Sequence, residues 1–586
     1  MNKQWIAKKI GIFLLCAAFM AACSNNATTT SNINNKDAGA ATAVQSGEST
    51  SGEPLASIDI AQEIKYDEDD SYTDWASTNP TVVTLSGAGA SVEGSGAEVK
   101  GSIITITAAG TYAVTGKLDD GQIVVNVPDD GVVRLILNGA EISNSTTSAI
   151  YVEEAGKTIL SLAEGTENLV SDGETYVFPD AATDEPNAAI FSKDDLTING
   201  TGKLVVEGNY NNGIASKDKL KIMGGALDIT AVDDGLMGRD LLAVQDGDIT
   251  VNAGGHAMKT TNDTVSEEGF LAIDGGAFNL KSVEDAVHSA GGIQINEGDL
   301  TINAGDDAIH AETSLLIAGG TTNITNSNEG LEASHIVIAD GVINVVAADD
   351  GVNAASASSD EAATTEQQAG PGSQGSSNNM ITITGGYLTV DAQGDGLDAN
   401  GSIAMSGGTV IVNGPTNGGN GSLDYDGNFD MTGGFLVAAG SPGMVQATSD
   451  ESTQAGILMT YTDTQQAGTL VHVEDSKGNA IITFAPSKTY QSVFISSPSL
   501  VQNATYTLYS GGTSTGTEVN GLYDGGEYQG GTKVVEFETA TLNTWLNESG
   551  VTEARSGMMG GRGGGGFGGG AGGERVRPEG GEAPPQ

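Results

Sequence analysis

The sequence has little positive charge and almost no cysteine, and both shortages narrow the possible functions. Its 586 residues include 24 Lys and Arg against 76 Asp and Glu, which gives a formal net charge of −52. So acidic a chain argues against nucleic acid or an anionic membrane surface as a direct partner, and it favours cations or polyanions that cations bridge. The two cysteines are Cys16 and Cys23, and Cys16 lies in a leader that is expected to be removed. No disulfide is therefore expected in the mature chain.

Helical periodicity and aromatic residues are also scarce. Aromatic residues make up 5% of the chain, and no segment beyond the N-terminal leader shows the 3.6-residue hydrophobic period of a helix. Glycine, in contrast, occurs 85 times. This composition favours a protein rich in strands and turns. The length exceeds that of one ordinary domain, but a solenoid grows by adding coils, so length does not fix the number of domains here.

A short pattern of an acid, a small residue, an aliphatic residue and a polar residue recurs between residues 233 and 398. The copies are Asp285-Ala286-Val287-His288, Asp307-Ala308-Ile309-His310, Glu329-Gly330-Leu331-Glu332, Asp350-Gly351-Val352-Asn353 and Asp395-Gly396-Leu397-Asp398. The first three steps, 307−285, 329−307 and 350−329, are 22, 22 and 21 residues. Two spaced aliphatic pairs follow each acid, such as Ile293/Ile295 and Leu300/Ile302, with glycine at the turns. This pattern predicts an all-β solenoid with coils of about 22 residues.

Stacked coils place equivalent residues in ladders about 4.8 Å apart, so the acids are expected to line one corner. Two unit charges at that separation repel by roughly 0.9 kcal/mol in water and roughly 3.5 kcal/mol at an effective dielectric of 20. Hard divalent cations neutralise such a row, and calcium accepts carboxylate and amide oxygens in flexible geometry. The alternative is that these residues only supply turn conformations with solvated side chains. The predicted calcium ligands are Asp233, Asp234, Glu284, Asp285, Asp306, Asp307, Asn328, Glu329, Asp349, Asp350, Asp395 and Asp398.

His288 and His310 occupy the same position in consecutive coils, and we expect both to contact a carbohydrate together with Lys259 and Tyr387. No cysteine lies near them and no third histidine is seen in register, so the sequence does not favour a zinc site. A lysine with a lowered pKa could act as the base of a lyase, and lysines are scarce near the acids. Such lysines are otherwise ordinary ion-pair partners. The candidates are Lys217, Lys219, Lys221, Lys259 and Lys281.

The N-terminus has the pattern of an exported lipoprotein. Three lysines precede an apolar run from Ile10 to Ala22, which is too short to span a membrane as a mature helix and indicates a signal peptide over residues 1–22. The run ends in Met20-Ala21-Ala22-Cys23-Ser24, which resembles a bacterial lipobox, so Cys23 is the expected lipidation site. Residues 23–56 are polar and small, and we expect a disordered tether.

The rest of the chain divides into three predicted parts. Residues 57–454 form the β-helix with an N-terminal cap, to which Trp75 and the acids from Asp67 to Asp70 are assigned. Residues 455–549 alternate between turns and predict a small antiparallel β-domain over the open end. Residues 550–586 are a disordered, glycine-rich tail. Two insertions, after His256 and after Asp350, leave from the acidic corner and favour that face for binding, although the longer one also fits a tolerated loop.

Three segments carry a resemblance to a known family. They are Gly110-Thr111-Tyr112-Ala113-Val114-Thr115-Gly116, the later Asp-Gly-Leu/Val-x-Ala coils, and Ser496-Ser497-Pro498 leading to Tyr506-Thr507-Leu508-Tyr509-Ser510-Gly511-Gly512. Over about residues 80–545 the chain resembles bacterial surface carbohydrate-binding β-helix proteins. The resemblance implies a right-handed parallel β-helix similar to family 9 pectate lyases, bound calcium, and affinity for acidic sugars such as polygalacturonate.

The acidic Asp-Gly turns of that family are matched at Asp234, Asp350 and Asp395, whereas Asp285 and Asp307 precede alanine and the coil of His256 lacks the acid. The resulting hypothesis is an extracellular, lipid-anchored and monomeric protein that binds an acidic polysaccharide through calcium without cleaving it. A calcium-dependent pectate-lyase-like enzyme and a structural surface spacer or adhesin are the two alternatives.

Overall fold

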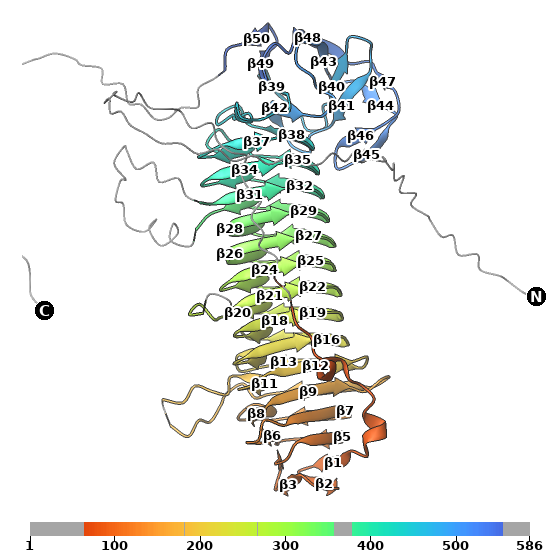
Figure 1. Ribbon diagram of the computed structural model, residues 1–586, viewed down its shortest axis with the longest axis vertical. Coiled ribbons are helices and arrows are strands. Elements are labelled where there is room, and N and C mark those ends of the chain that lie inside the picture. The colour runs from red at the N-terminus through yellow and green to blue at the C-terminus, as the bar shows by residue number, and fades with distance from the viewer. Residues whose placement is uncertain (1–61, 63, 181, 266–267, 357–377, 555–586) are drawn as a thin grey trace, which may run out of the picture. The chain divides into compact units, whose positions relative to one another are not determined.

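Short strands follow one another along the chain, and each pairs in parallel with its counterpart one coil further on (Figure 1). The computed structural model describes residues 62, 64–180, 182–265, 268–356 and 378–554, all within one compact unit. Ile214 pairs with Leu236 and Leu236 with Met258, so consecutive coils are 22 residues apart (236−214 and 258−236). The prediction of a parallel β-helix with coils of about this length is confirmed.

The first stack of strands follows the acidic corner of each coil. Its strands are short because the chain turns again after three to five residues in most coils. They are β4 (Ile103–Ile106), β6 (Gln122–Asn126), β8 (Ile150–Glu154), β11 (Ala188–Ser192), β14 (Asn212–Ser216), β17 (Leu236–Gly238), β20 (Met258–Thr260), β23 (Val287–Ser289), β26 (Ile309–Ile317), β28 (Leu331–Ile338), β30 (Val352–Ala354), β33 (Leu397–Ala399) and β36 (Leu423–Tyr425).

The second stack runs alongside, and β26 and β28 contribute their C-terminal halves to it. Its other strands are β1 (Thr81–Gly87), β5 (Gly110–Leu118), β7 (Val132–Ser143), β9 (Lys157–Leu162), β12 (Leu196–Gly200), β15 (Lys219–Ile222), β18 (Leu241–Val244), β21 (Phe270–Ile273), β24 (Gly292–Ile295), β31 (Met380–Ile383), β34 (Ser402–Met405) and β37 (Phe429–Met431).

The third stack closes each coil before the next acidic corner. It comprises β10 (Glu167–Ser171), β13 (Lys203–Gly208), β16 (Ala226–Ala231), β19 (Asp248–Ala253), β22 (Ala277–Lys281), β25 (Asp299–Asn303), β27 (Thr321–Asn326), β29 (Val342–Ala347), β32 (Tyr387–Ala392), β35 (Thr409–Asn413) and β38 (Phe435–Gly440).

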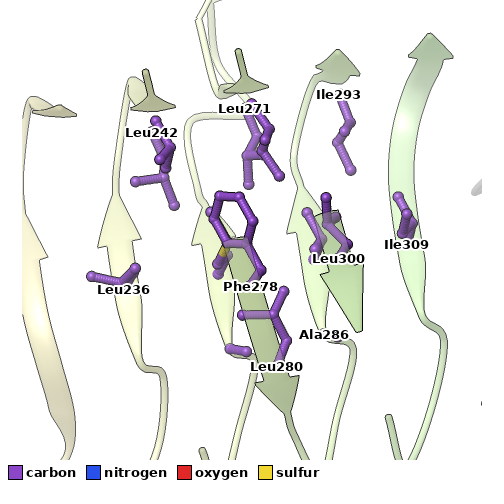
Figure 2. Close-up of a cluster of buried hydrophobic side chains, with 14 of the residues drawn as sticks. Leu236, Leu242, Leu271, Phe278, Leu280, Ala286, Ile293, Leu300 and Ile309 are labelled. Atoms are coloured by element: carbon purple, nitrogen blue, oxygen red, sulfur yellow. The ribbon is translucent and has the colours of Figure 1, made fainter. Parts of the chain in front are cut away.

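Aliphatic side chains from all three stacks fill the interior. Figure 2 shows Leu242, Leu271 and Ile293, which come from consecutive coils and point into the same space, and each is at most 1% exposed. Burying one such side chain stabilises the fold by about 1.5–3 kcal/mol. A single coil could not cover this surface, so stability depends on stacking.

Antiparallel strands close both ends of the stack. At the start, β2 (Ala90–Glu93) pairs with β1 and β3 (Ala97–Lys100) pairs with β4. At the other end, β38 pairs antiparallel with β42 (Tyr490–Ser496), which also pairs with β39 (Gly456–Gln465). The strands β49 (Asn543–Asn547) and β50 (Gly550–Thr552) extend this edge.

A separate six-stranded antiparallel sheet confirms the predicted C-terminal β-domain (Figure 1). In spatial order it contains β45 (Thr517–Val519), β46 (Leu522–Asp524), β41 (Ala480–Phe484), β40 (Val471–Asp475), β43 (Thr505–Ser510) and β48 (Thr532–Glu538), and β44 (Thr513–Ser514) pairs with β47 (Tyr528–Gln529) beside it.

Residues 62 and 64–78, which we name the N-terminal strap, lie along the outside of the second stack. The strap contains helix α1 (Glu68–Ser71) and a 3-10 helix (Trp75–Thr78). The backbone N–H of Gln62 donates to Gln294 Oε1 (2.8 Å), and the ring of Trp75 packs on Ala113 and Ile136. The assignment of Trp75 and Asp67 to Asp70 to an end cap was therefore wrong, because these residues cross several coils on the side of the β-helix.

The predicted signal peptide, the predicted lipidation site Cys23, the predicted tether and residues 555–586 of the predicted tail lie outside the described residues. Most of the longer insertion, residues 357–377, does so too. Among the residues that the structure describes, helices are too short and too polar to cross a membrane.

Candidate cation-binding corner

Three columns of polar side chains run along the corner before and within the first stack. We name them by position. The corner ladder is Asn212, Asp234, His256, Asp285, Asp307, Glu329, Asp350 and Asp395. The outer ladder, one residue earlier, is Asp233, Glu284, Asp306, Asn328 and Asp349. The strand ladder, three residues after the corner ladder, is Lys259, His288, His310, Glu332, Asn353, Asp398 and Asp424, which pair in that order.

The corner ladder is held by hydrogen bonds from one coil to the next. The carboxylate oxygen Oδ1 of Asp234 accepts the backbone N–H of His256 (3.0 Å), and Asp285 does the same for Asp307 (3.1 Å). Asp307 accepts the N–H of Glu329 (2.9 Å). One oxygen of each of these carboxylates therefore satisfies backbone, which explains the preference for Asp or Asn here, while the second oxygen stays free for other partners.

The residue after each corner acid must be small because it faces the interior. A Cβ on Gly351 would lie 2.2 Å from Val390 Cγ1, whereas Ala286 and Ala308 are accommodated and fully buried. Glycine is thus required at Gly351 for space, and alanine fulfils the same role in other coils. The departures at Ala286 and Ala308 do not interrupt the ladder.

Histidines concentrate in one part of the corner, which we name the histidine stretch. The His256 and His288 rings stack with centroids 4.7 Å apart, and His310 meets His288 edge-on at 5.2 Å. Asp285 Oδ2 lies between them, 2.9 Å from His288 Nδ1 and 3.6 Å from Nδ1 of both His256 and His310. No third histidine lies in register with His288 and His310, since Lys259 occupies that position, but His256 reaches His288 from the corner ladder.

Burial and close charges shift the pKa values of this stretch in opposite directions. Burial, together with the charge of Lys259, lowers the pKa of His256 to about 4, so the ring is neutral at pH 7. Burial also opposes ionisation of Asp285, but hydrogen bonds from His288 and His310 outweigh it and hold the pKa of that carboxyl well below its usual range. Burial opposes protonation of His310, but its hydrogen bond with Asp285 and the charges of Glu332 and Asp285 outweigh burial and raise its pKa to about 9. The ionised Asp285 therefore lies between a neutral His256 ring and a protonated His310 ring.

From Asp307 onward, apart from His310, the corner consists mostly of acids, and we name this part the carboxylate stretch. One ligand atom each of Asp307, Glu329 and Glu332 lies within 4.8 Å of the other two, and none of these residues is fully exposed. Asn353 donates to Glu329 Oε2 (2.8 Å). Further along, the N–H of Asp395 donates to Asp350 Oδ1 (2.5 Å). Oxygen atoms of this number and spacing form a donor set for a hard divalent cation.

The carboxylates of this stretch resist ionisation. Burial, then the neighbouring charges of Glu332, Asp307 and Asp350, raises the pKa of Glu329 to about 9. Burial and the charges of Asp350 and Asp395 likewise raise the pKa of Asp398 to about 8. In the part of the chain that the structure describes, no Lys or Arg side chain forms an ion pair with Asp350, Asp395 or Asp398. A bound divalent cation would supply the missing counter-charge.

The structure brings three of the four predicted carbohydrate-contacting residues together. Lys259, 3.3 Å from Asp234 Oδ2, and His288 line a hollow of about 490 Å³ together with Glu312, and His310 lies next to His288. Tyr387 lies apart on the third stack, where its hydroxyl donates to the Val519 carbonyl (3.4 Å) and its ring packs against the C-terminal β-domain.

The lysines considered as catalytic bases lie on different sides of the β-helix. Lys219 and Lys221 lie on the second stack, away from the acids, and Lys221 pairs with the buried Asp70 (2.8 Å). Lys217 pairs with Glu185. Lys281 ends β22 in the third stack. Of the five candidates, only Lys259 reaches the corner, so the expectation that all of them lie near the acidic face was wrong.

Sequence reasoning missed three residues of the corner. His256 follows Asp234 by 22 residues (256−234), so the period alone would have included it had the acid not been required. Glu332 and Asp424 follow from the strand register, since Glu332 pairs with His310 and Asp424 with Asp398.

Comparison with known proteins places a match over this corner. Residues 100–371 match the model of a family described as carbohydrate-binding domain-containing protein. A curated protein of that description from Acetivibrio thermocellus is 41% identical over 128 residues, which are 22% of this chain and 45% of the relative. The chain thus aligns with less than half of that relative's length. A solved structure of a polysaccharide lyase-like protein from C. thermocellum, a gadolinium derivative, is 32% identical, with a TM-score of 0.40 over 41% of this chain and 97% of that one.

Proposed function

We propose that this chain binds an acidic polysaccharide at the bacterial cell surface, through calcium ions held by the carboxylate stretch. The observation that carries the proposal is the set of carboxylates Asp350, Asp395 and Asp398, with which no described Lys or Arg side chain forms an ion pair. Within the same stretch, Glu329 and Asp398 have strongly raised pKa values. The family match over residues 100–371, to proteins described as carbohydrate-binding, includes this stretch as far as Asp350 and supports the class of ligand.

The residues present suit calcium. Asp307, Glu329 and Glu332 offer only oxygen ligands, and carboxylates further along add more at Asp350 and Asp395. When bound, the ion supplies positive charge that both the ladder and a sugar carboxylate can share. Lys259 and His288, which line the adjoining hollow, would then orient the sugar by hydrogen bonds.

The test is retention of the protein on polygalacturonate with calcium and with chelator. Retention is expected only with calcium. The variant Asp307→Asn/Glu329→Gln should lose most of it, because amides keep the acceptor oxygens for the Glu329 N–H and the Asn353 amide but carry no charge. The matched control, Asp248→Asn/Asp299→Asn, removes two exposed charges from the third stack and should bind normally.

Binding that persists in chelator would contradict the calcium bridge, and failure to retain any acidic glycan would favour a spacer or adhesin. The same incubation separates the lyase alternative, because β-elimination produces an ultraviolet-absorbing unsaturated sugar. We expect none.

Cell-surface attachment rests on Cys23, which follows the lipobox-like segment Met20 to Ser24. Replacing Cys23 with Ala should remove the acyl chains that hold the protein on the membrane, so the protein should become soluble or stay unprocessed. Fractionation of cells measures this directly, and a Cys23→Ala variant that remains membrane-bound and processed would exclude lipid anchoring.

A further inference from the structure

The histidine stretch contains a buried nitrogen whose partner is missing. His256 is 9% exposed, and its ring nitrogen Nδ1 is buried without a hydrogen bond. Its other nitrogen, Nε2, lies 2.9 Å from Glu284 Oε2. In a neutral imidazole only one nitrogen carries hydrogen, and the contact with Glu284 places it on Nε2. The lone pair of Nδ1 therefore points into the protein.

This lone pair faces a second electron-rich atom. Asp285 Oδ2 lies 3.6 Å from His256 Nδ1, too far for a hydrogen bond, and the same oxygen lies 2.9 Å from His288 Nδ1. Two acceptor atoms that face each other across a buried gap cost stability unless a positive charge lies between them. In a tetrahedral zinc site with ligands about 2.05 Å from the metal, two ligand atoms lie about 3.3 Å apart. The distance of 3.6 Å between His256 Nδ1 and Asp285 Oδ2 is close to that value.

We infer that His256 Nδ1, His288 Nδ1 and Asp285 Oδ2 form a binding site for a divalent transition metal of the zinc type. One ligand atom each of these three residues lies within 4.8 Å of the others. Two imidazoles and one carboxylate are a donor set that zinc accepts and that calcium, which prefers oxygen, does not. On binding, His288 Nδ1 exchanges its proton for the metal, and the proton passes to solvent.

Glu284 orients the ring of His256 in this site. Metal-bound histidines commonly donate their second N–H to a carboxylate, which fixes the tautomer and the ring plane. The contact between Glu284 and His256 Nε2 has this arrangement. The site is therefore pre-organised by a residue of the outer ladder.

The site does not depend on the proposed carbohydrate function, and its test uses zinc alone. Tag-free full-length protein, freed of metal by chelator, is titrated with Zn²⁺ in a calorimeter and in competition with a chromogenic chelator. We expect one ion per chain at this site, undisturbed by excess Ca²⁺. His256→Ala and His288→Gln should each weaken binding by more than the roughly 10- to 100-fold that loss of an outer-shell partner costs.

The matched control is His335→Ala, which removes a half-buried histidine of β28 outside the site and should leave zinc affinity unchanged. Each variant must melt like the parent in chelator, and the half-buried His288 is the position that best tolerates replacement. Cobalt substitution adds an independent readout, because a tetrahedral site gives intense visible absorption. Absence of zinc binding, unchanged binding in both site variants, or full displacement by calcium would overturn the inference.

Discussion

Asp70 of the N-terminal strap and the acids of the carboxylate stretch are all removed from water, but their surroundings differ. Asp70 is fully buried and receives hydrogen bonds from Lys157, Lys221 and Thr197, each at 2.8 Å. Burial opposes its ionisation, but these donors outweigh burial and lower the pKa of Asp70 to about 2. In the carboxylate stretch, burial and neighbouring acids instead raise the pKa of Glu329 to about 9.

The two regions differ in whether the fold supplies a counter-charge to the buried carboxylate. At the strap two lysines pair with Asp70, whereas with Asp350, Asp395 and Asp398 no Lys or Arg of the described chain forms an ion pair. Removing a compensated charge should therefore destabilise the protein, and removing an uncompensated one should stabilise it.

The largest expected effect is at Asp70. Replacing Asp70 with Ala leaves the buried Lys221 without its carboxylate and Lys157 with Asp67 alone, which should cost about 3–5 kcal/mol. Hydrogen exchange of the β12 and β15 amides measures the loss locally. The control is Asp69→Ala, which breaks a half-exposed pair with Arg134 and should cost about 1 kcal/mol or less. An equal loss of unfolding free energy in the two variants would contradict a stabilising role of the buried Asp70 ion pairs.

Calcium should have the next largest effect. An ion that binds only the folded stack stabilises it by about 2.7 kcal/mol per site at a hundredfold excess over the dissociation constant. Chelation should thus lower the melting temperature, and calcium should restore it better than magnesium, which requires stricter octahedral geometry. Asp70→Ala should keep the full calcium increment. A melting temperature that does not change with calcium would contradict calcium binding by the carboxylate stretch.

The smallest effect, and the most specific, concerns Asp398→Asn. The folded pKa of Asp398, about 8, lies above its unfolded value of 3.8, so the folded state keeps a proton that the unfolded chain loses as pH rises. The parent therefore loses stability between about pH 4 and pH 8, and the amide variant does not. In chelator we expect the variant to gain about 1–3 kcal/mol at pH 8 and almost nothing at pH 4.

Melting curves at both pH values measure this gain, with the exposed Asp248→Asn as control. A gain at pH 4 equal to that at pH 8 would contradict an origin in the buried charge.

The carboxylate stretch was largely predictable from the sequence because each coil repeats the same backbone conformation and places a corner residue at the same position. Asp307, Glu329 and Asp350 recur at steps of 22 and 21 residues (329−307 and 350−329), and the burial that spaces the aliphatic residues also spaces the acids. His256 escaped because the pattern required an acid where the fold requires only a side chain that suits the corner. The repeat period therefore predicts where the corner residue of each coil lies, and it does not predict which residue type occurs there.

The strap could not be predicted in the same way. Asp70 meets Lys157 and Lys221, which are 87 and 151 residues away, and no repeat relates the strap to the coils it crosses. For the same reason Lys219 and Lys221 were assigned to the wrong face. Their alternation along the strand places them on the outside of a coil but does not say which of its sides.

The direction of the strap has a mechanical consequence. Gln62 contacts Gln294, Tyr66 contacts Asp274, and Asp70 contacts Lys221 and Lys157, so the chain crosses the coils backwards. A pulling force on the chain ahead of residue 62 would act on these contacts one after another, so the strap would detach from the coils stepwise. The uncharged hydrogen bonds of Gln62 and Tyr66 would break first, and the two ion pairs of Asp70 would resist further detachment before the force reached the terminal coil.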